Sequence, residues 1–166
     1  GFLTSEYAIS TSVNYALGGY YIGSWLAETI GGEGNVIVME GIPGASASDS
    51  QHAGMLRALA EYPDITVVAE IAHMWTPQIA QAELQKWLSA NTTQVDGFAV
   101  QSSGESGALN ALESSGRPMV PMALGGEIGA FCYWRNNPDF IDRAIYTWPP
   151  GDDAEFAMNV LLRTLK

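Results

Sequence analysis

The sequence lacks most of the features that would tie the chain to a metal ion, a nucleic acid or a membrane surface. It holds a single cysteine, Cys132, so no intrachain disulfide can form and no cysteine cluster can bind a metal. Seven Lys and Arg residues stand against 18 Asp and Glu residues, which gives a formal net charge of −11. Because so acidic a surface repels phosphate backbones and anionic lipids, we expect no nucleic-acid partner.

Long apolar runs are absent as well. No run reaches the ~18 apolar residues that a membrane-spanning helix needs. Of the residues present, 47% are hydrophobic and only 15% are charged, which excludes a disordered chain. A length of 166 residues is typical of one domain with a sizeable core.

Short apolar runs alternate with amphipathic segments along the chain. The clearest run, 36–39, follows a glycine-rich turn at 31–34 and predicts a buried strand. Similar runs predict strands at 8–11, 65–69, 97–100, 119–122 and 144–147. Helical spacing of apolar residues lies between them, and strands that alternate with helices favour right-handed crossovers. We therefore predict an α/β fold with a doubly wound open parallel sheet.

Three local patterns refine this prediction. A long helix over 15–30 contains Gly18, Gly19 and Gly23, which would let a neighbouring element approach closely. Pro121 cannot donate a hydrogen bond to a sheet, so its strand is predicted to lie near a sheet edge. A sharp break over 148–152 precedes one last helix that would still need a partner, and we therefore expect the chain to be a fragment of a larger fold.

Candidate binding residues gather where the predicted strands end, because ligands of open parallel sheets bind beyond the carboxyl ends of the strands. The side chains there are amides, hydroxyls, a carboxylate and indoles. Such groups suit an uncharged, polyhydroxylated ligand, since amides and carboxylates bind neighbouring hydroxyls and an indole covers the C–H face of a sugar ring. The segments that carry them are 41–50, 72–76, 101–106, 125–129 and 146–148, and the candidate ligand-binding residues are Gln51, Trp75, Gln101, Glu127 and Trp148.

Each candidate also has a structural interpretation. Gln51 follows a predicted helix cap at 49–50 and by itself would be expected to face solvent. Trp75, which precedes a Thr-Pro helix start, is either a ligand platform or a loop anchor. Gln101 meets a ligand or ties down a loop, and Glu127 accepts ligand hydroxyls or caps a helix. Trp148 reaches the ligand or braces the following Pro-Pro turn.

Catalytic patterns are incomplete. Residues 44–48 lack the closing glycine of a nucleophile elbow, and 104–107 is one residue too short for one. The glycines of 41–44 lack the Gly-Lys-Ser/Thr ending of a phosphate loop. His52 and His73 have no metal-binding partner at helical spacing, and His73 is expected to be a hydrogen-bonded loop histidine. We predict a binding protein without catalytic residue, metal or cofactor, and rank a hydrolase using Ser46 or Ser106 with His73 well below it.

The order of several motifs is similar to that of a known family. The motifs are Gly18-Gly19-Tyr20-Tyr21-Ile22-Gly23, then 34–41, then Gly44 and Ser46 up to Gly54-Met55, then 95–98, 107–112 and 116–118. In this order they resemble the periplasmic sugar-binding proteins of ABC importers. The resemblance is to the ribose-binding-like (type I) group, which also supplies the effector domain of lactose-repressor-type regulators.

The resemblance implies two α/β lobes joined by three crossing strands, with the ligand trapped as the lobes close. It places residues 1–148 in the second (C-terminal) lobe, with crossing strands at both ends (8–13 and 145–148), as a single lobe of a type I periplasmic-binding-protein fold. It assigns the helix within 149–166 to the otherwise missing first lobe.

The resemblance also assigns roles to the candidate residues. Gln51 stands where the family has an arginine that binds sugar hydroxyls, and Trp75 matches the aromatic that stacks on the ring. Gln101 matches an asparagine, Glu127 lies near the family's acidic ligand residue, and Trp148 falls where a glutamine often lies.

The function implied by the resemblance is that of a solute-binding component of an ABC importer. Its ligand would be a sugar, a polyol or a similar small neutral solute, and its partners a membrane permease and the missing first lobe. Its location would be periplasmic, or extracellular and membrane-associated through its transporter. The alternative is the effector-binding lobe of a lactose-repressor-type regulator, against which the acidic charge argues because such regulators need a basic DNA-binding module.

Overall fold

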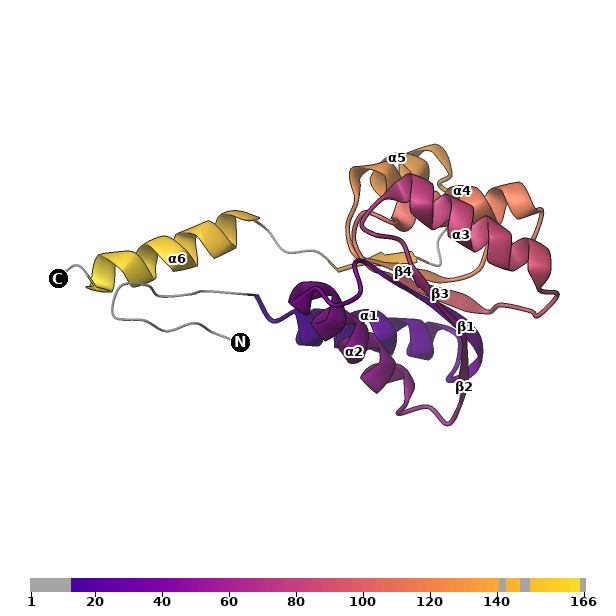
Figure 1. Ribbon diagram of the computed structural model, residues 1–166, viewed down its shortest axis with the longest axis horizontal. Coiled ribbons are helices and arrows are strands. Elements are labelled where there is room, and N and C mark those ends of the chain that lie inside the picture. Colours follow the sequence, from indigo (N-terminus) through magenta and orange to yellow (C-terminus); the bar gives the residue numbers. More distant parts are fainter. Residues whose placement is uncertain (1–12, 141–142, 147–149, 165–166) are drawn as a thin grey trace. The chain divides into compact units, whose positions relative to one another are not determined.

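The computed structural model describes residues 13–140, 143–146 and 150–164 (Figure 1). Residues 15–146 form one compact unit, and the two ends of the chain belong to a second unit. Of that second unit the structure describes residues 13–14 and helix α6 (Pro150–Thr164). The predicted strand at 8–11 and the candidate Trp148 lie outside the described residues. The division of the chain at residue 148 stays a prediction.

The larger unit is built on a five-stranded, all-parallel sheet with the order β2-β1-β3-β4-β5. The strands are β1 (Glu33–Glu40), β2 (Asp64–Ala72), β3 (Gly97–Val100), β4 (Met122–Leu124) and β5 (Arg143–Ile145). The helices are α1 (Tyr15–Thr29), α2 (Ser46–Leu59), α3 (Pro77–Ala90), α4 (Glu105–Ser115) and α5 (Ile128–Asn136).

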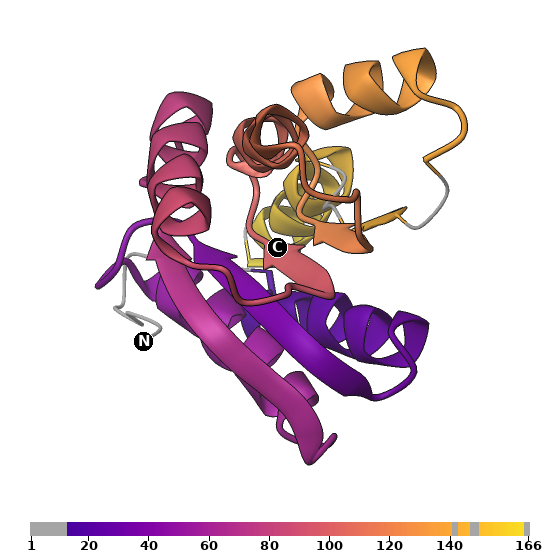
Figure 2. The ribbon, with the colours of Figure 1, turned by 90° about the vertical axis from the view of Figure 1, so that its right-hand side faces the viewer.

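The helices cover both faces of the sheet, which confirms the predicted α/β fold. Helices α1 and α2 pack on one face and α3 and α4 on the other (Figure 2). The chain steps from β1 to β2 in one direction and then crosses back to β3 on the other side of β1. The carboxyl ends of β1 and β3 therefore mark the switch point at which open α/β sheets bind their ligands.

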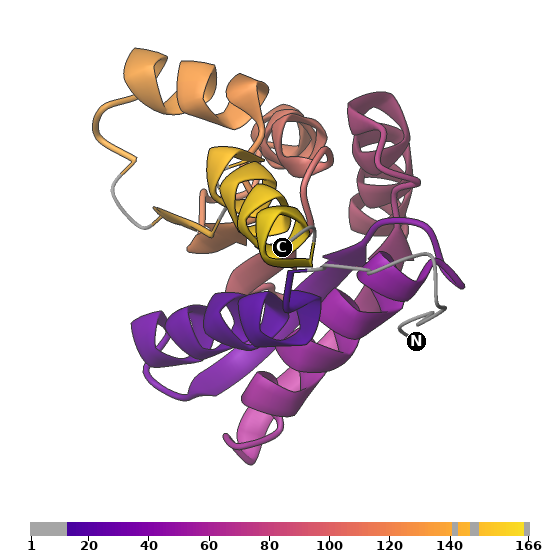
Figure 3. The same ribbon diagram turned by 90° about the vertical axis from the view of Figure 1, so that its left-hand side faces the viewer.

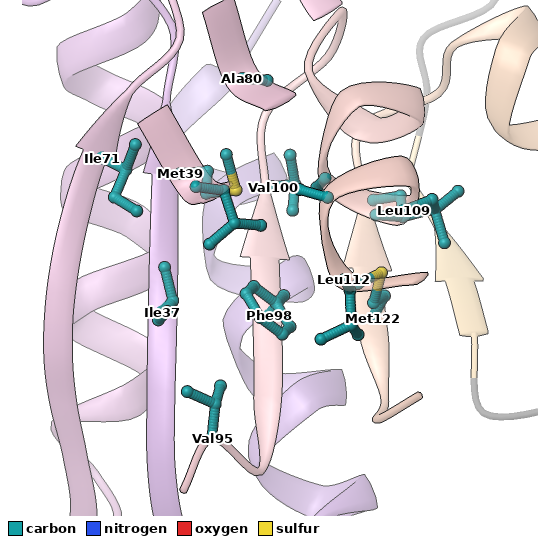
Figure 4. Close-up of a cluster of buried hydrophobic side chains, with 14 of the residues drawn as sticks. Ile37, Met39, Ile71, Ala80, Val95, Phe98, Val100, Leu109, Leu112 and Met122 are labelled. Atoms are coloured by element: carbon teal, nitrogen blue, oxygen red, sulfur yellow. The ribbon is translucent and has the colours of Figure 1, made fainter. Parts of the chain in front are cut away.

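The continuous apolar run of β1 is divided between the two faces. Ile37 and Met39 enter the core under α3 and α4 (Figure 4), whereas Val36 and Val38 enter the core under α1 and α2. Since successive side chains of a strand point to opposite faces, a strand that is covered on both sides needs apolar residues at every position. This is why the run does not alternate with polar residues.

Helix α1 lies close to its neighbours because small residues line its contacts. A Cβ atom on Gly19 would lie 1.9 Å from the carbonyl oxygen of Gln51, and one on Gly54 would lie 2.1 Å from that of Ala16. The backbones of α1 and α2 are thus in direct contact, and Figure 3 shows the two helices side by side. The predicted close approach at the α1 glycines is confirmed.

Three expectations differ from the structure. The strand expected at 119–122 begins only at Met122, as β4, which lies beside the edge strand β5 but pairs on both sides, so Pro121 precedes the strand. Its carbonyl accepts a hydrogen bond from Phe98 N (3.0 Å), while its missing N–H falls before the strand begins. Helix α2 begins at Ser46, ahead of the expected cap, and the sequence indicated α5 only through the helix-cap interpretation of Glu127.

Candidate functional site

The loops that follow the parallel strands meet at one edge of the sheet and are joined by hydrogen bonds. After β2, His73 N donates to the carbonyl oxygen of Glu40 (2.8 Å), the last residue of β1, and Met74 N donates to that of Gly41 (3.0 Å), which follows it. After β3, Ser102 Oγ donates to the carbonyl of Gly125 (2.7 Å), beyond β4. These bonds join segment 72–76 to 41–50 and segment 101–106 to 125–129, four of the five segments that carry the candidate residues.

Gln101 ties two of these segments, 41–50 and 101–106, together at the switch point. Its side chain is fully buried. Its Oε1 atom accepts hydrogen bonds from Gly41 N (3.0 Å) and Ser48 Oγ (3.1 Å), and its Nε2 atom donates to the carbonyl of Ser48 (2.9 Å). The amide thus links the end of β3 to the end of β1 and the first turn of α2. This is the loop-tying interpretation; contact with a ligand stays a prediction for Gln101.

Trp75 lies in a strained turn between β2 and α3. Met74 and Trp75 have φ angles of 54° and 52°, in the left-handed region that residues with a Cβ atom avoid. The indole rests against Gly41, whose Cβ atom, if it existed, would lie 2.0 Å from Trp75 Nε1. The residue is 38% exposed, so part of it is open to solvent or to a ligand. Thr76 is the N-cap and Pro77 begins α3, as predicted.

Gln51 lies on α2 and is only 7% exposed, so the expectation that it faces solvent is wrong. The reason is the helix crossing, in which Gly19 of α1 packs directly on the backbone of Gln51. Because α2 begins at Ser46, Gln51 lies one turn further into the helix than its sequence neighbours indicated. Its predicted contact with a ligand stays a prediction.

Glu127 is the N-cap residue of α5, as its structural interpretation expected, but its carboxylate bonds to another helix. Its Oε2 atom accepts from Ser106 N (3.0 Å) and its Oε1 atom accepts from Ser106 Oγ (2.6 Å). The half-buried carboxylate therefore satisfies an N–H group in the first turn of α4, where a negative charge is also favoured by the helix dipole.

Two further titratable groups lie beside Glu127, and both are fully buried. His73 packs its ring against Gly104, and neither of its ring nitrogens has a hydrogen-bond partner among the described residues. The expectation that His73 is hydrogen-bonded through its side chain is therefore wrong. Burial lowers the pKa of His73 to about 4, although its own backbone and the Glu127 carboxylate oppose this change, so the ring is neutral at pH 7.

Glu105, the first residue of α4, is the second buried group. Its Oε2 atom accepts a hydrogen bond from Gly104 N (2.9 Å), and its Oε1 atom receives none. Burial, followed in size by the nearby charge of Glu127, raises the pKa of Glu105 to about 8. No sequence pattern pointed to this residue, because a glutamate in the first turn of a helix is ordinarily a solvated group.

The geometry argues against the hydrolase hypothesis. Ser106 donates its hydroxyl to Glu127, while the His73 ring nitrogens are unpaired, so no serine–histidine hydrogen bond forms. Ser46 is exposed at the start of α2. In the part of the chain that is described, no group of three or more His, Cys, Asp or Glu residues could hold a metal ion. The same part contains no helix long and apolar enough to cross a membrane.

A known protein family matches nearly the whole length of the chain. The periplasmic binding protein domain matches residues 3–166. A xylitol-binding protein of Mycolicibacterium smegmatis is 35% identical over 98 residues, which cover 58% of this chain and 28% of that protein.

Solved structures agree. An ABC transporter periplasmic solute-binding protein of Actinobacillus succinogenes with bound D-allose has a TM-score of 0.80 at 29% identity, covering 93% of this chain and 54% of that one. A solute-binding protein of Thermobispora bispora has a TM-score of 0.74 at 25% identity, covering 84% of this chain and 43% of that one. The chain thus spans about half or less of the length of these relatives, and it belongs to the periplasmic binding protein domain family.

Proposed function

We propose that this chain is the second lobe of a solute-binding component of an ABC importer. Its ligand would be a sugar, a polyol or a similar small neutral solute, bound where the strands end. The observation that carries the proposal is the meeting of an indole, a carboxylate and amides from separate loops at the switch point, in a chain that belongs to this family. Xylitol and D-allose, which the names of two relatives mention, are the first solutes to try.

In this proposal Trp75 stacks on the solute and Glu127 accepts its hydroxyls. Support for Trp75 comes from its ring, which is fixed on one side by Gly41 and partly exposed on the other. Support for Glu127 comes from its two hydrogen bonds to Ser106, which fix the carboxylate and leave lone pairs free, since each ionised oxygen accepts more than one bond. Gln51, Gln101 and Trp148 complete the proposed set.

We propose further that the protein is not an enzyme and that it is periplasmic or extracellular. A first lobe would close over the solute, and the closed form would dock on the membrane permease. Closure would remove water from the site, so that both lobes contribute to affinity.

The test is a thermal-shift titration of the chain, and of any longer protein that contains it, with xylitol and D-allose. A solute that binds only the folded state raises the unfolding midpoint, by about 2.7 kcal/mol of stability at a concentration 100 times its Kd. We expect a saturable rise that Trp75→Leu abolishes. Trp87→Leu, which changes an indole near the C-terminal end of α3, is the matched control and should leave the rise intact.

Two results would contradict the proposal. One is the absence of any midpoint rise with these solutes and a wider set of neutral sugars and polyols, in both proteins. The other is a rise that survives Trp75→Leu but is lost in Trp87→Leu, because binding would then lie in the groove beside β2 and α3.

A further inference from the structure

The two carboxyl oxygens of Glu105 differ in their hydrogen bonding. Oε2 accepts from Gly104 N at 2.9 Å, whereas Oε1 receives no hydrogen bond, and the residue has 0% of its surface exposed. A buried carboxylate oxygen without a donor costs the full desolvation of its charge. An oxygen that carries a proton instead becomes a donor and needs only an acceptor.

The acceptor nearest at hand is the Glu127 carboxylate. It accepts two hydrogen bonds from Ser106, the residue that follows Glu105 in the chain, and its charge adds to the effect of burial in raising the pKa of Glu105. Two neighbouring carboxyl groups oppose each other's ionisation, which favours a proton on one of them. The choice between them follows from their partners. Glu127 accepts two hydrogen bonds from Ser106, which favour its ionised form, while Glu105 is the more deeply buried of the two.

We propose that Glu105 is protonated at neutral pH, donates a hydrogen bond to Glu127, and by this shared proton positions the Glu127 carboxylate for the hydroxyls of a bound solute. Glu105 is then a positioning residue behind the site, touching no solute itself. The part of the proposal that concerns the solute rests on the proposed function, while the shared proton does not.

The surroundings contain no charge that would replace the proton. The β2–α3 turn presents His73, whose ring lies against Gly104 and is neutral above pH of about 4, the value to which burial lowers its pKa. The β4–α5 loop presents Glu127. Helix α3 packs on α4, and the Lys86 and Glu83 side chains that it carries are exposed and paired with each other at 3.4 Å. Helix α5 also packs on α4; its Cys132 and Arg135 side chains are exposed, and burial raises the pKa of Tyr133 above its usual value.

Loss of the proton should weaken binding. Above the Glu105 pKa of about 8 the two carboxylates repel each other, and Glu127 leaves the position fixed by Ser106. If only the protonated form binds, the apparent affinity falls roughly tenfold between pH 7 and pH 9.

The first experiment needs no solute. The carboxyl carbons of the glutamates are followed by NMR from pH 4 to pH 10 in the ¹³C-labelled chain, in Glu105→Gln and in Glu113→Gln. Gln mimics the protonated acid, since its amide donates to Glu127 and its carbonyl accepts from Gly104 N. Glu113 lies exposed on the same helix and is the matched control.

We expect one carboxyl signal that titrates near pH 8 in the wild-type chain and in Glu113→Gln, and that is missing from Glu105→Gln. Titration of every glutamate below about pH 5.5 would overturn the proposal, whatever the protein binds. So would a high titration that persists in Glu105→Gln, because the proton would then belong to another group.

The second experiment tests the positioning role, with xylitol as the probe. The wild-type protein should bind xylitol roughly tenfold more weakly at pH 9 than at pH 7, whereas Glu105→Gln should bind equally at both. A parallel loss of affinity in both proteins overturns the positioning role. Absence of xylitol binding at any pH overturns it for this solute together with the proposed function, while the carboxyl titration still decides the shared proton.

Discussion

Two buried polar side chains, Gln101 and Glu105, lie four residues apart at the same edge of the sheet, and they differ in how completely they are hydrogen-bonded. Gln101 uses both amide atoms in three hydrogen bonds to two other segments. Glu105 leaves one oxygen without a partner, and the neighbouring His73 leaves two nitrogens without one in the described residues. The first group is satisfied by the fold, whereas the second is satisfied only by a proton or a ligand.

The difference separates structure from function at this edge. A neutral amide whose oxygen and nitrogen are both hydrogen-bonded inside the chain stabilises the loops. Titratable groups that are buried and unsatisfied cost stability, and such costs concentrate at functional sites. We therefore expect changes of pH and the binding of a ligand to affect the group formed by Glu105, His73 and Glu127.

The largest loss of stability should follow from removing the hydrogen bonds of Gln101. Gln101→Met keeps the length of the side chain and removes the amide, which leaves Gly41 N and the polar groups of Ser48 without partners. We expect a loss of about 3 kcal/mol in the free energy of unfolding, measured by urea denaturation. Gln94→Met, at an exposed position, should cost less than about 1 kcal/mol. Equal losses in both variants would remove the distinction.

The unsatisfied side should respond to pH. The pKa of Glu105 is raised from 4.5 to about 8 by folding, so the folded chain holds a proton that the unfolded chain releases between these values. Stability from this group is present below pH 4.5 and is lost as the pH rises to about 8. Between pH 6.5 and 8 the wild-type chain should lose about 2 kcal/mol relative to Glu105→Gln. Urea denaturation at several pH values measures this difference, and an unchanged difference would contradict the raised pKa.

His73 should act with the opposite sign. Its pKa is lowered from 6.5 to about 4, so the unfolded chain takes up a proton that the folded chain refuses, and stability falls as the pH drops from 6.5 towards 4. His73→Met should change stability by less than about 1 kcal/mol at pH 7 and should be about 2 kcal/mol more stable than wild type at pH 4.5. Chemical denaturation at the two pH values checks this, and a large loss at pH 7 would mean that the ring makes bonds after all.

The smallest effect concerns the strained turn that carries Trp75. Met74 has a φ of 54° and is partly exposed, so Met74→Gly should stabilise the chain by up to about 1 kcal/mol. Ser103, with a φ of 69° in the β3–α4 loop, offers a second test, and Ser103→Gly should have the same sign. The thermal unfolding midpoint measures both. A fall in the midpoint of both variants would show that these backbone angles are not strained.

Much of the fold could be predicted from the sequence because it depends on local patterns. The apolar run of β1, the α1 glycines and the Thr76–Pro77 helix start each impose a local conformation or a close approach. Pro121 was assigned to the strand itself, but it precedes β4, and its position relative to the strand start decides whether its missing N–H matters.

The location of the candidate site could be predicted from the sequence, but the burial and protonation of its residues could not. The five strand ends follow from the alternation of strands and helices, and Trp75 and Glu127 could be singled out by residue type. The burial of Gln51 depends on a helix crossing with Gly19, distant in the sequence. The state of Glu105 depends on Glu127 in another loop. Pairings of this kind are set by tertiary structure, so no spacing within the chain reveals them.

The central claim is that a neutral, polyhydroxylated solute binds at the carboxyl edge of the sheet beside Trp75. The most direct measurement is an NMR titration of the ¹⁵N-labelled chain with xylitol, observing the indole N–H signals of Trp75 and Trp87 and the amide of Ser106. The account predicts saturable shifts of the Trp75 indole and the Ser106 amide with one common Kd, while the Trp87 indole stays in place. Shifts confined to Trp87, or no saturable shift with xylitol or any other neutral sugar or polyol tested, would contradict it.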